Sequence, residues 1–381
     1  MALQNVDYLV LSDTANELSP VNRIHYAQID TIRGITICFI VWGHCLLGWE
    51  NFVPGNTLDS VLKLAVFQTG KIGTVIFFVI SGFLLRPKLR EYTFINYCKA
   101  RLPRVYIPWL SFMLFFLLLG VFQILPLAEI WAHRDFRLLT RDVYNLIVGV
   151  LLYTAYWFVT TYIVSMLLLV SMRKYAEHIW LGAALGSITL FYGVNYYYQW
   201  IPANHGKAIL AYAFFVWLGI QLHKYYPLVQ ATVERIPWII VCTAFILFFT
   251  LCCVEANYLS GIGCADPFGS NRISNSILSL IFFAGLLKIG RSVRINKLKP
   301  RKTVFGVFLM HVVVIFELSI LVKHYFSVRL LNNVWKLLAF QFVFLAATML
   351  ITYGLVRLIE RTNYRWLLGL SSKGAKGRTE F

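Results

Sequence analysis

The sequence predicts an all-α integral membrane protein, a bundle of about ten transmembrane helices with both termini in the cytoplasm. Three observations lead to this prediction: the composition, the long apolar stretches and the uneven distribution of basic residues. Hydrophobic residues make up 59% of the 381 residues, charged residues make up 14%, and the mean hydropathy is +0.68. Roughly a quarter of the residues in a soluble domain are charged, so this chain cannot cover its folded surface with polar groups.

Ten apolar stretches are candidate spans, since a helix needs about 20 apolar residues to cross the hydrocarbon core. In chain order they centre on Ile40, Phe77, Phe115, Ile163, Gly186, Phe215, Phe245, Phe282, Val312 and Leu345. Loops that contain Gly or Pro, such as RPKLR and NKLKPRK, separate many of them. Between the third and fourth stretches, Val143 to Tyr153 is apolar but short, which indicates a re-entrant or interfacial segment.

The basic residues predict the direction of the spans. With the N-terminus inside, 24 Lys and Arg residues fall in inner segments and 10 in outer segments, while Arg33 lies in a span. Cytoplasmic loops are enriched in Lys and Arg, so both termini are expected inside. The predicted organisation is a polar segment over residues 1–28, a membrane domain over 29–360 and a basic tail over 361–381. The first segment lacks the features of a signal peptide, so the first span is expected to be retained.

The net charge of +18 does not indicate nucleic-acid binding in this setting, because membrane proteins collect basic residues in their inner loops. The seven cysteines include no Cys-x-x-Cys pair, and no His or carboxylate cluster has the spacing of metal ligands. We therefore predict no metal, no bound cofactor and no nucleic-acid partner. The lipid bilayer is the expected environment.

The first candidate span, Ile29 to Trp49, carries two ionisable residues on one face. Arg33 is expected near the cytoplasmic mouth, and His44 follows eleven residues later. Helix geometry places His44 about 16 Å deeper and within about 20° of the same direction. Intramembrane ionisable groups usually face a bundle interior or a wet cavity, so the pair predicts a cavity entered from the cytoplasm. The alternatives are an Arg33 that snorkels to the interface and a His44 that hydrogen-bonds a neighbouring helix.

Four motifs occur in order along the chain. The first consists of Arg33 and His44, with ten residues between them, and Arg33 is the fourth residue of the sequence DTIRG, which begins at Asp30. FFVISGFLL (Phe77 to Leu85) and RLPR (Arg101 to Arg104) follow, and FGVFLMH (Phe305 to His311) comes late in the chain. Together they resemble the membrane acyltransferase-3 family over nearly the whole chain. Some members of that family carry an appended extracytoplasmic hydrolase-like domain, and no such domain is expected here. The membrane domain is therefore expected to work alone.

The resemblance implies an O-acyltransferase, most often an O-acetyltransferase, that uses cytoplasmic acyl-coenzyme A as donor substrate. The implied acceptor is a hydroxyl of a cell-surface glycan such as O-antigen, exopolysaccharide or a lipid-linked precursor, and the implied location is the plasma (inner) membrane. His44 and Arg33 are the predicted catalytic residues, with His44 as the candidate general base because histidine titrates near neutral pH. A covalent acyl-histidine is the other option, and the sequence does not separate the two.

Five residues are expected to bind the acyl-coenzyme A. Arg33, Arg101 and Arg104 suit its phosphates, because guanidinium groups bind phosphate in bidentate fashion. Membrane anchoring is the alternative for Arg101 and Arg104. Ser81 and Gly82 are expected beside the acyl arm, where serine offers a hydrogen bond and glycine offers space; close helix packing is the alternative.

Three further residues are expected to support the site. Asp30 lies one helical turn before Arg33 and either holds the guanidinium group or is an ordinary interfacial aspartate. Trp157 either lines the acceptor entrance or belongs to an aromatic belt at the membrane interface. His311 lies about midway through the ninth span, where ionisable residues are functional by default, or it hydrogen-bonds a neighbouring helix.

A transporter or flippase of a lipid-linked sugar or small acyl compound is the alternative function. Transporters often show internal repeats and spans broken by Gly or Pro, and neither is clear in this sequence. A non-catalytic scaffold has no need for an arginine and a histidine stacked within a span. The expected depth of His44, beyond the midplane, favours an acceptor that approaches from outside.

Overall fold

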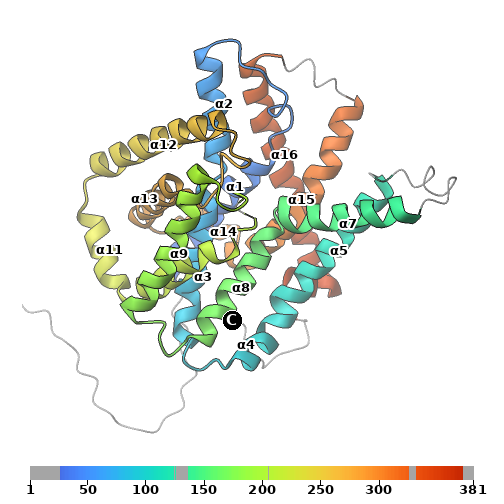
Figure 1. Cartoon of the computed structure of the whole chain (residues 1–381). Coiled ribbons are helices and arrows are strands. Elements are labelled where there is room, and N and C mark those ends of the chain that lie inside the picture. Colours follow the sequence, from blue (N-terminus) through green and yellow to red (C-terminus); the bar gives the residue numbers. More distant parts are fainter. Residues whose placement is uncertain (1–25, 124, 126–135, 205, 326–331, 372–381) are drawn as a thin grey trace, which may run out of the picture.

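The computed structural model describes residues 26–123, 125, 136–204, 206–325 and 332–371, and within these ranges it contains helices and turns but no strand. The predicted all-α class is therefore confirmed. Figure 1 shows the helices packed together as a bundle, with α2 at one end and α4 at the other. Residues 1–25 of the segment predicted over 1–28, and residues 372–381 of the tail predicted over 361–381, lie outside the described residues.

The helices have the following bounds. In chain order they are α1 (Ala27–His44), α2 (Thr57–Thr69), α3 (Ile72–Leu85), α4 (Phe94–Arg101), α5 (Ile107–Gln123), α7 (Phe136–Tyr153), α8 (Trp157–Ser171), α9 (Ile179–Tyr198), α10 (Ala213–Lys224), α11 (Tyr226–Arg235), α12 (Trp238–Gly261), α13 (Ile273–Ile289), α14 (Val293–Lys297), α15 (Pro300–Tyr325) and α16 (Val334–Arg361). Short 3-10 segments are η1 (Arg86–Lys88), η3 (Ile209–Tyr212) and η5 (Asn363–Leu368), and a π-helical turn, η2 (Leu102–Tyr106), joins α4 to α5.

Several helices are long and apolar enough to cross a membrane. Among the described residues there are five such segments, or six if α7 and α8, which bend by 63° at their junction, form one span. Each of the ten predicted centres falls within a helix. However, the apolar helices over Ile209–Lys224 and Ile273–Ile289 are short for a full span. Crossing by all ten helices, with both termini inside, therefore stays a prediction. The predicted re-entrant or interfacial segment lies within α7.

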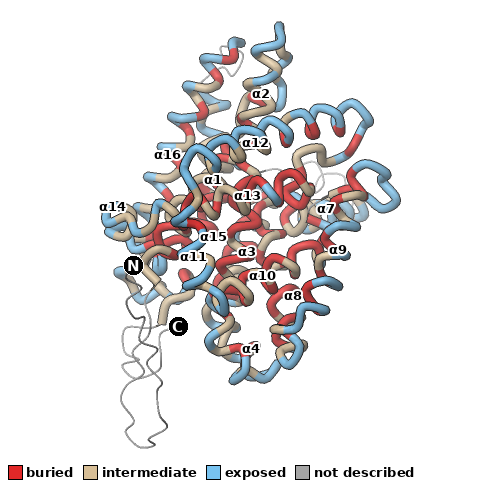
Figure 2. The backbone as a smooth tube through the Cα atoms, turned by 90° about the vertical axis from the view of Figure 1, so that its left-hand side faces the viewer, coloured by how far each residue is buried: buried red, intermediate tan, exposed pale blue. Residues whose placement is uncertain are grey.

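The outer helices present apolar side chains at the surface of the bundle. Ile239 and Leu247 on α12, and Val343 and Leu350 on α16, are all well exposed. Figure 2 shows the buried backbone concentrated in the centre, where α3 and α10 lie, while α12 and α16 are largely exposed or half-buried. Monomeric soluble proteins rarely carry large contiguous apolar patches, so this distribution indicates a surface in contact with lipid. The structure therefore agrees with a multi-pass membrane protein.

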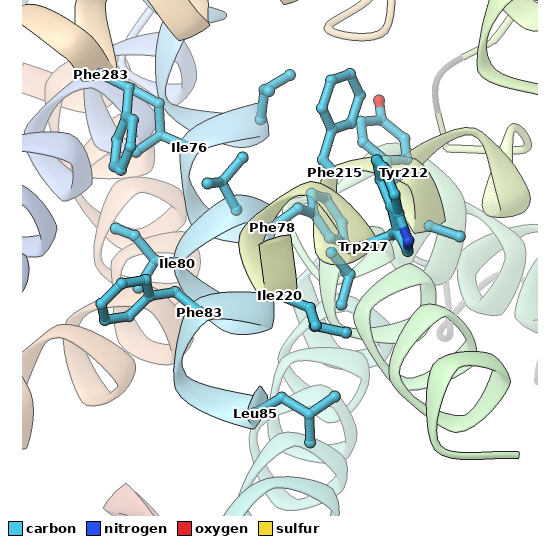
Figure 3. Close-up of a cluster of buried hydrophobic side chains, with 14 of the residues drawn as sticks. Ile76, Phe78, Ile80, Phe83, Leu85, Tyr212, Phe215, Trp217, Ile220 and Phe283 are labelled. Atoms are coloured by element: carbon cyan, nitrogen blue, oxygen red, sulfur yellow. The ribbon is translucent and has the colours of Figure 1, made fainter. Parts of the chain in front are cut away.

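Two glycines bring the backbones of α3 and α10 into direct contact at the centre of the bundle. A Cβ on Gly82 would lie 1.8 Å from the carbonyl oxygen of Val216, and a Cβ on Gly219 would lie 1.9 Å from the carbonyl oxygen of Val79. Small residues at helix interfaces permit such close approach in membranes. Figure 3 shows the buried side chains that surround this contact, including the ring of Phe78 beside that of Tyr212.

We expect Gly82→Ala to destabilise the protein by about 1–3 kcal/mol, because the added methyl group overpacks the contact with a backbone carbonyl that cannot move aside. Gly354→Ala on α16 is the matched control, since no atom of the described residues lies within 4 Å of its added Cβ. Alanine favours a helix over glycine, so the control is expected to be neutral or slightly stabilised. Thermal unfolding in detergent compares them, and equal melting temperatures would rule out the packing role of Gly82.

A fully buried arginine ties the start of α13 to the junction of α2 and α3. Arg272 donates from Nη1 to the carbonyl oxygen of Cys252 at 2.9 Å and to the carboxylate of Glu255 at 3.2 Å. Its Nη2 donates to the side-chain oxygen of Gln68 at 2.5 Å. Glu255 also accepts from Ser274 and from Tyr197. The ion pair is thus enclosed by hydrogen bonds from α2, α9, α12 and α13.

Candidate active site

Asp30 and Arg33 form an ion pair near the start of α1. A guanidinium nitrogen of Arg33 lies 3.1 Å from a carboxylate oxygen of Asp30, and the side chains are only 18% and 10% exposed. The helical i,i+3 spacing brings the two side chains together. Because both are largely removed from water, Asp30 restricts the guanidinium group more than an exposed partner would.

Helices α1 and α15 pack against each other and run in the same direction. Near their starts, Arg33 and Arg301 are electrostatic neighbours. Farther along, the imidazole rings of His44 and His311 lie 5.3 Å apart between centroids, with their planes tilted by 52°. The two pairs are eleven residues apart on α1 and ten on α15, which corresponds to about 15–16 Å of helix. Two arginines and two histidines therefore mark the two ends of one helix interface.

His311 is completely buried, and one of its ring nitrogens is held by the backbone. Its Nδ1 lies 2.6 Å from the carbonyl oxygen of Phe308. A carbonyl only accepts, so Nδ1 carries the proton and Nε2 of the neutral ring carries the lone pair. That Nε2 is buried and has no hydrogen-bond partner among the described residues. His44, at the last position of α1, is exposed. The pair thus combines an accessible imidazole with a buried one of fixed tautomer.

Apolar side chains fill the interface between the two pairs. Ile37 and Val41 follow Arg33 by four and eight residues, so they lie on the same face of α1. Both are buried in one hydrophobic cluster with Val307 and Phe308 of α15. Packed apolar side chains therefore occupy the column where the sequence predicted a cavity.

Arg101 of the RLPR motif has an electrostatic neighbour in common with Arg33 of α1. Tyr162 is an electrostatic neighbour of both Arg33 and Arg101. The guanidinium carbon of Arg101 also lies 5.4 Å from the centre of the Tyr97 ring, within the range of a cation–π contact. Its Nε is buried and has no hydrogen-bond partner in the described part of the chain. Residues far apart in the sequence therefore converge on one tyrosine.

Arg104 lies in η2, the π-helical turn that joins α4 to α5, three residues after Arg101 at the end of α4. Pro103 lies in the first positions of that turn. Tyr92 is an electrostatic neighbour of both arginines. Single π-helical turns inside helices are frequent at functional sites, because they redirect side chains that a regular helix would space evenly. We use the name arginine cluster for Arg33, Arg101, Arg104 and Arg301, which lie at the end of the bundle where α1 begins.

Buried hydroxyl groups lie on α8 next to Tyr162. Thr160, Thr161 and Ser165 are within one helical turn of it, and their hydroxyl oxygens have no hydrogen-bond partner among the residues described. A buried polar group without a partner costs about 1–3 kcal/mol. A polar ligand near the arginine cluster would satisfy such groups and remove part of this cost.

The other predicted residues have contacts that packing and local hydrogen bonding explain. Ser81 donates its hydroxyl to the carbonyl oxygen of Phe77 at 2.6 Å, one turn earlier in α3. Gly82 contacts the backbone of α10, as described above. Trp157 is buried, with its ring centroid 5.4 Å from that of Tyr212. Gly82 and Trp157 therefore belong to the core of the bundle in this structure, and Ser81 is half-buried.

Sequence reasoning alone does not assign Arg301 and Tyr162 to the cluster. Arg301 reads as one basic residue among several in an inner loop, and Tyr162 as one aromatic residue of YWFVTTY. A usable signal exists for Arg301, because it precedes His311 by ten residues, close to the spacing of Arg33 and His44. Tyr162 has no comparable signal, since its role depends on how α8 packs.

The comparisons with known proteins concern almost the whole chain. The sequence profile of the acyltransferase domain of type 3 matches residues 26–357, a range that includes the arginine cluster and both histidines. Neither the curated proteins nor the solved structures gave a significant match. The profile match, which spans the helical bundle from α1 into α16, shows that the chain belongs to the acyltransferase-3 family.

Proposed function

We propose that the protein transfers an acyl group, most often acetyl, from cytoplasmic acyl-coenzyme A to a hydroxyl of a cell-surface glycan. The observation that carries this proposal is the pairing along α1 and α15, with Arg33 and Arg301 as electrostatic neighbours at one end and His44 beside His311 at the other. Family membership supports acyl transfer in general. The donor, the acceptor and the roles of individual residues belong to the proposal.

The arginine cluster is the proposed binding site for the phosphates of the donor. Arginine binds phosphate through two parallel N–H donors, and such charge-assisted bonds are stronger than neutral ones. Asp30 orients Arg33, and Tyr97 faces Arg101. The remaining positive charge of the cluster suits a ligand with several phosphates. Because basic residues are most abundant in the inner segments, the donor is expected from the cytoplasm.

The arm of the donor has to reach from the arginine cluster toward the histidine pair, over about 15–16 Å of helix. Ile37 and Val41 of α1 are buried along this path. The proposal therefore requires these apolar side chains to move aside when the donor binds. The unpaired hydroxyl groups of Thr161 and Ser165 offer partners for the amide groups of the arm near its entry.

His44 is the proposed general base. The acceptor oxygen forms a bond to the thioester carbon while its proton passes to the imidazole; the carbon–sulfur bond then breaks, and the departing thiolate takes up a proton. His44 is the last residue of α1, and the C-terminal end of a helix stabilises the positive charge that the ring gains. His311 lies beside it as a second, buried imidazole whose tautomer is fixed. The exposure of His44 suits an acceptor that enters from the outer side.

Phosphate binding by the cluster has a direct test. Arg101→Gln is expected to raise KM for acetyl-coenzyme A about 10- to 100-fold, since a hydrogen bond to a charged group contributes about 1.5–3 kcal/mol. With acetyl-pantetheine, which lacks the nucleotide phosphates, the variant and the wild type are expected to have equal kcat/KM. The comparison separates lost phosphate contacts from a damaged fold.

The control for this test is Arg294→Gln on α14, an exposed basic residue that is expected to leave both donors unaffected. An Arg101→Gln variant that loses the same factor with both donors would show that Arg101 acts through the fold and not through the phosphates.

A further inference from the structure

A second basic site lies at the connection between α8 and α9. A cavity of about 530 Å³ is lined by Arg90, Arg173, Lys174, Glu177 and His178. It lies at the same end of the bundle as the start of α1, because Lys224 bonds to Glu177 while the adjacent His223 bonds to Tyr26, next to the first residue of α1. The arginine cluster does not include any of these residues.

Among the described residues that line this cavity there is one carboxylate, and several cations already share it. Glu177 lies 2.8 Å from Arg86, 2.9 Å from Arg90 and 3.3 Å from Lys224. Burial opposes ionisation, but these cations outweigh it and hold the pKa of Glu177 below its ordinary value. Arg173 and Lys174 bring two more positive charges to the cavity. The region therefore keeps a net positive charge with Glu177 ionised, and an anionic ligand fits it.

The surroundings of the cavity are those of a membrane interface. Tyr175 is 59% exposed and Trp180 is 79% exposed, and Ile179 between them in sequence is also well exposed. Exposed Tyr and Trp residues are typical of the level of the lipid headgroups. Helix α9 begins at Ile179 and presents further exposed apolar residues, among them Leu190 and Phe191, along its length. Its N-terminal N–H groups add a partial positive charge beside the cavity.

We propose that this cavity binds the phosphate of an anionic phospholipid headgroup, with the acyl chains of the lipid lying along the exposed face of α9. Charge complementarity supports a phosphate ligand, since Arg90 and Lys174 are accessible for contact. The exposed apolar residues that α9 carries from Ile179 onward favour a lipid over a free phosphate, because a soluble ligand gains nothing from them. The site is independent of the acyl-transfer site.

The test measures the affinity of a tail-labelled phosphatidylglycerol for the purified full-length protein in neutral detergent micelles. Basic residues near a membrane surface contribute about 1 kcal/mol each to binding anionic lipid. The double variant Arg173→Gln, Lys174→Gln is therefore expected to bind about 30-fold more weakly. Phosphatidylcholine and soluble glycerol phosphate are expected to displace the label only at much higher concentration than unlabelled phosphatidylglycerol.

The control variant Arg294→Gln, Lys297→Gln removes the same two charges from the exposed surface of α14 and is expected to bind like the wild type. The charge-conserving variant Arg173→Lys, Lys174→Arg is expected to retain binding, which excludes a loss through misfolding. Equal affinity in the wild type and the Arg173→Gln, Lys174→Gln variant would overturn the proposal. If glycerol phosphate displaces the label as effectively as the unlabelled lipid, the ligand is a free phosphate and not a lipid. If phosphatidylcholine displaces it as effectively, the negative charge of the headgroup plays no part in binding.

Discussion

Replacement of His44 by alanine lowers kcat for acyl transfer by about 10²- to 10⁴-fold, the range that general-base catalysis supplies. The KM for the acyl donor is expected to stay near that of the wild type, because the donor phosphates are bound at the arginine cluster about 15–16 Å away along α1. Initial rates with labelled acetyl-coenzyme A and a glycan acceptor in proteoliposomes give both constants. The exposed position of His44 means that the substitution removes few packing contacts.

Two companion variants sharpen this result. His44→Gln keeps polarity and approximate size but cannot take a proton, so it is expected to be as inactive as His44→Ala. His311→Gln is expected to reduce kcat and also to lower the melting temperature, because His311 is buried and bonded to the carbonyl oxygen of Phe308. A His44→Gln variant with more than about a tenth of the wild-type kcat would be incompatible with proton transfer to His44.

Arg272→Ala is expected to cause the largest loss of stability, about 3–5 kcal/mol. Removal of one partner from a buried ion pair leaves the other charge uncompensated, here the carboxylate of Glu255. The guanidinium group also bonds to Gln68 and to the carbonyl oxygen of Cys252, which lose their donors. Chemical denaturation in detergent, or the melting temperature of the purified protein, measures the change.

The coupling between the two charges can be measured separately. The double variant Arg272→Met, Glu255→Gln is expected to lose less stability than the sum of the losses in Arg272→Met and in Glu255→Gln. The reason is that the double variant leaves no unpaired buried charge. The exposed Arg294→Ala serves as the control and is expected to change stability by less than about 0.5 kcal/mol. Additive effects of the two single substitutions would show that the ion pair contributes nothing beyond its separate contacts.

Properties that depend on local spacing could be predicted from the sequence. The helical class followed from composition, and the pairing of Asp30 with Arg33 followed from the helical period. The same period placed Arg33 and His44 on one face, which is the face that packs on α15. The presence of a helix at each predicted centre could also be predicted, because each apolar stretch is nearly continuous in the sequence.

Properties that depend on packing between distant helices could not be predicted. Arg272 reads from the sequence as one of the basic residues of an outer loop, yet the structure buries it in a network from four helices. Gly82 reads equally well as space for an acyl arm or as a packing residue, and only the position of Val216 distinguishes these. Arg301 joins Arg33 because α15 runs alongside α1 in one particular register, which a single sequence does not encode in any short motif.

The most direct test of the proposed function follows labelled acetyl groups in sealed membrane vesicles that contain the protein and its native glycans. Acetyl-coenzyme A labelled in the acetyl group is supplied on the side expected to be cytoplasmic. The proposal predicts that label becomes covalently attached to glycan with the wild type and that this attachment is lost with His44→Gln. Vesicles in which the wild type transfers no label to glycan, while a lipid-linked sugar or a small acyl compound still moves across the membrane, would contradict acyl transfer along α1 and α15.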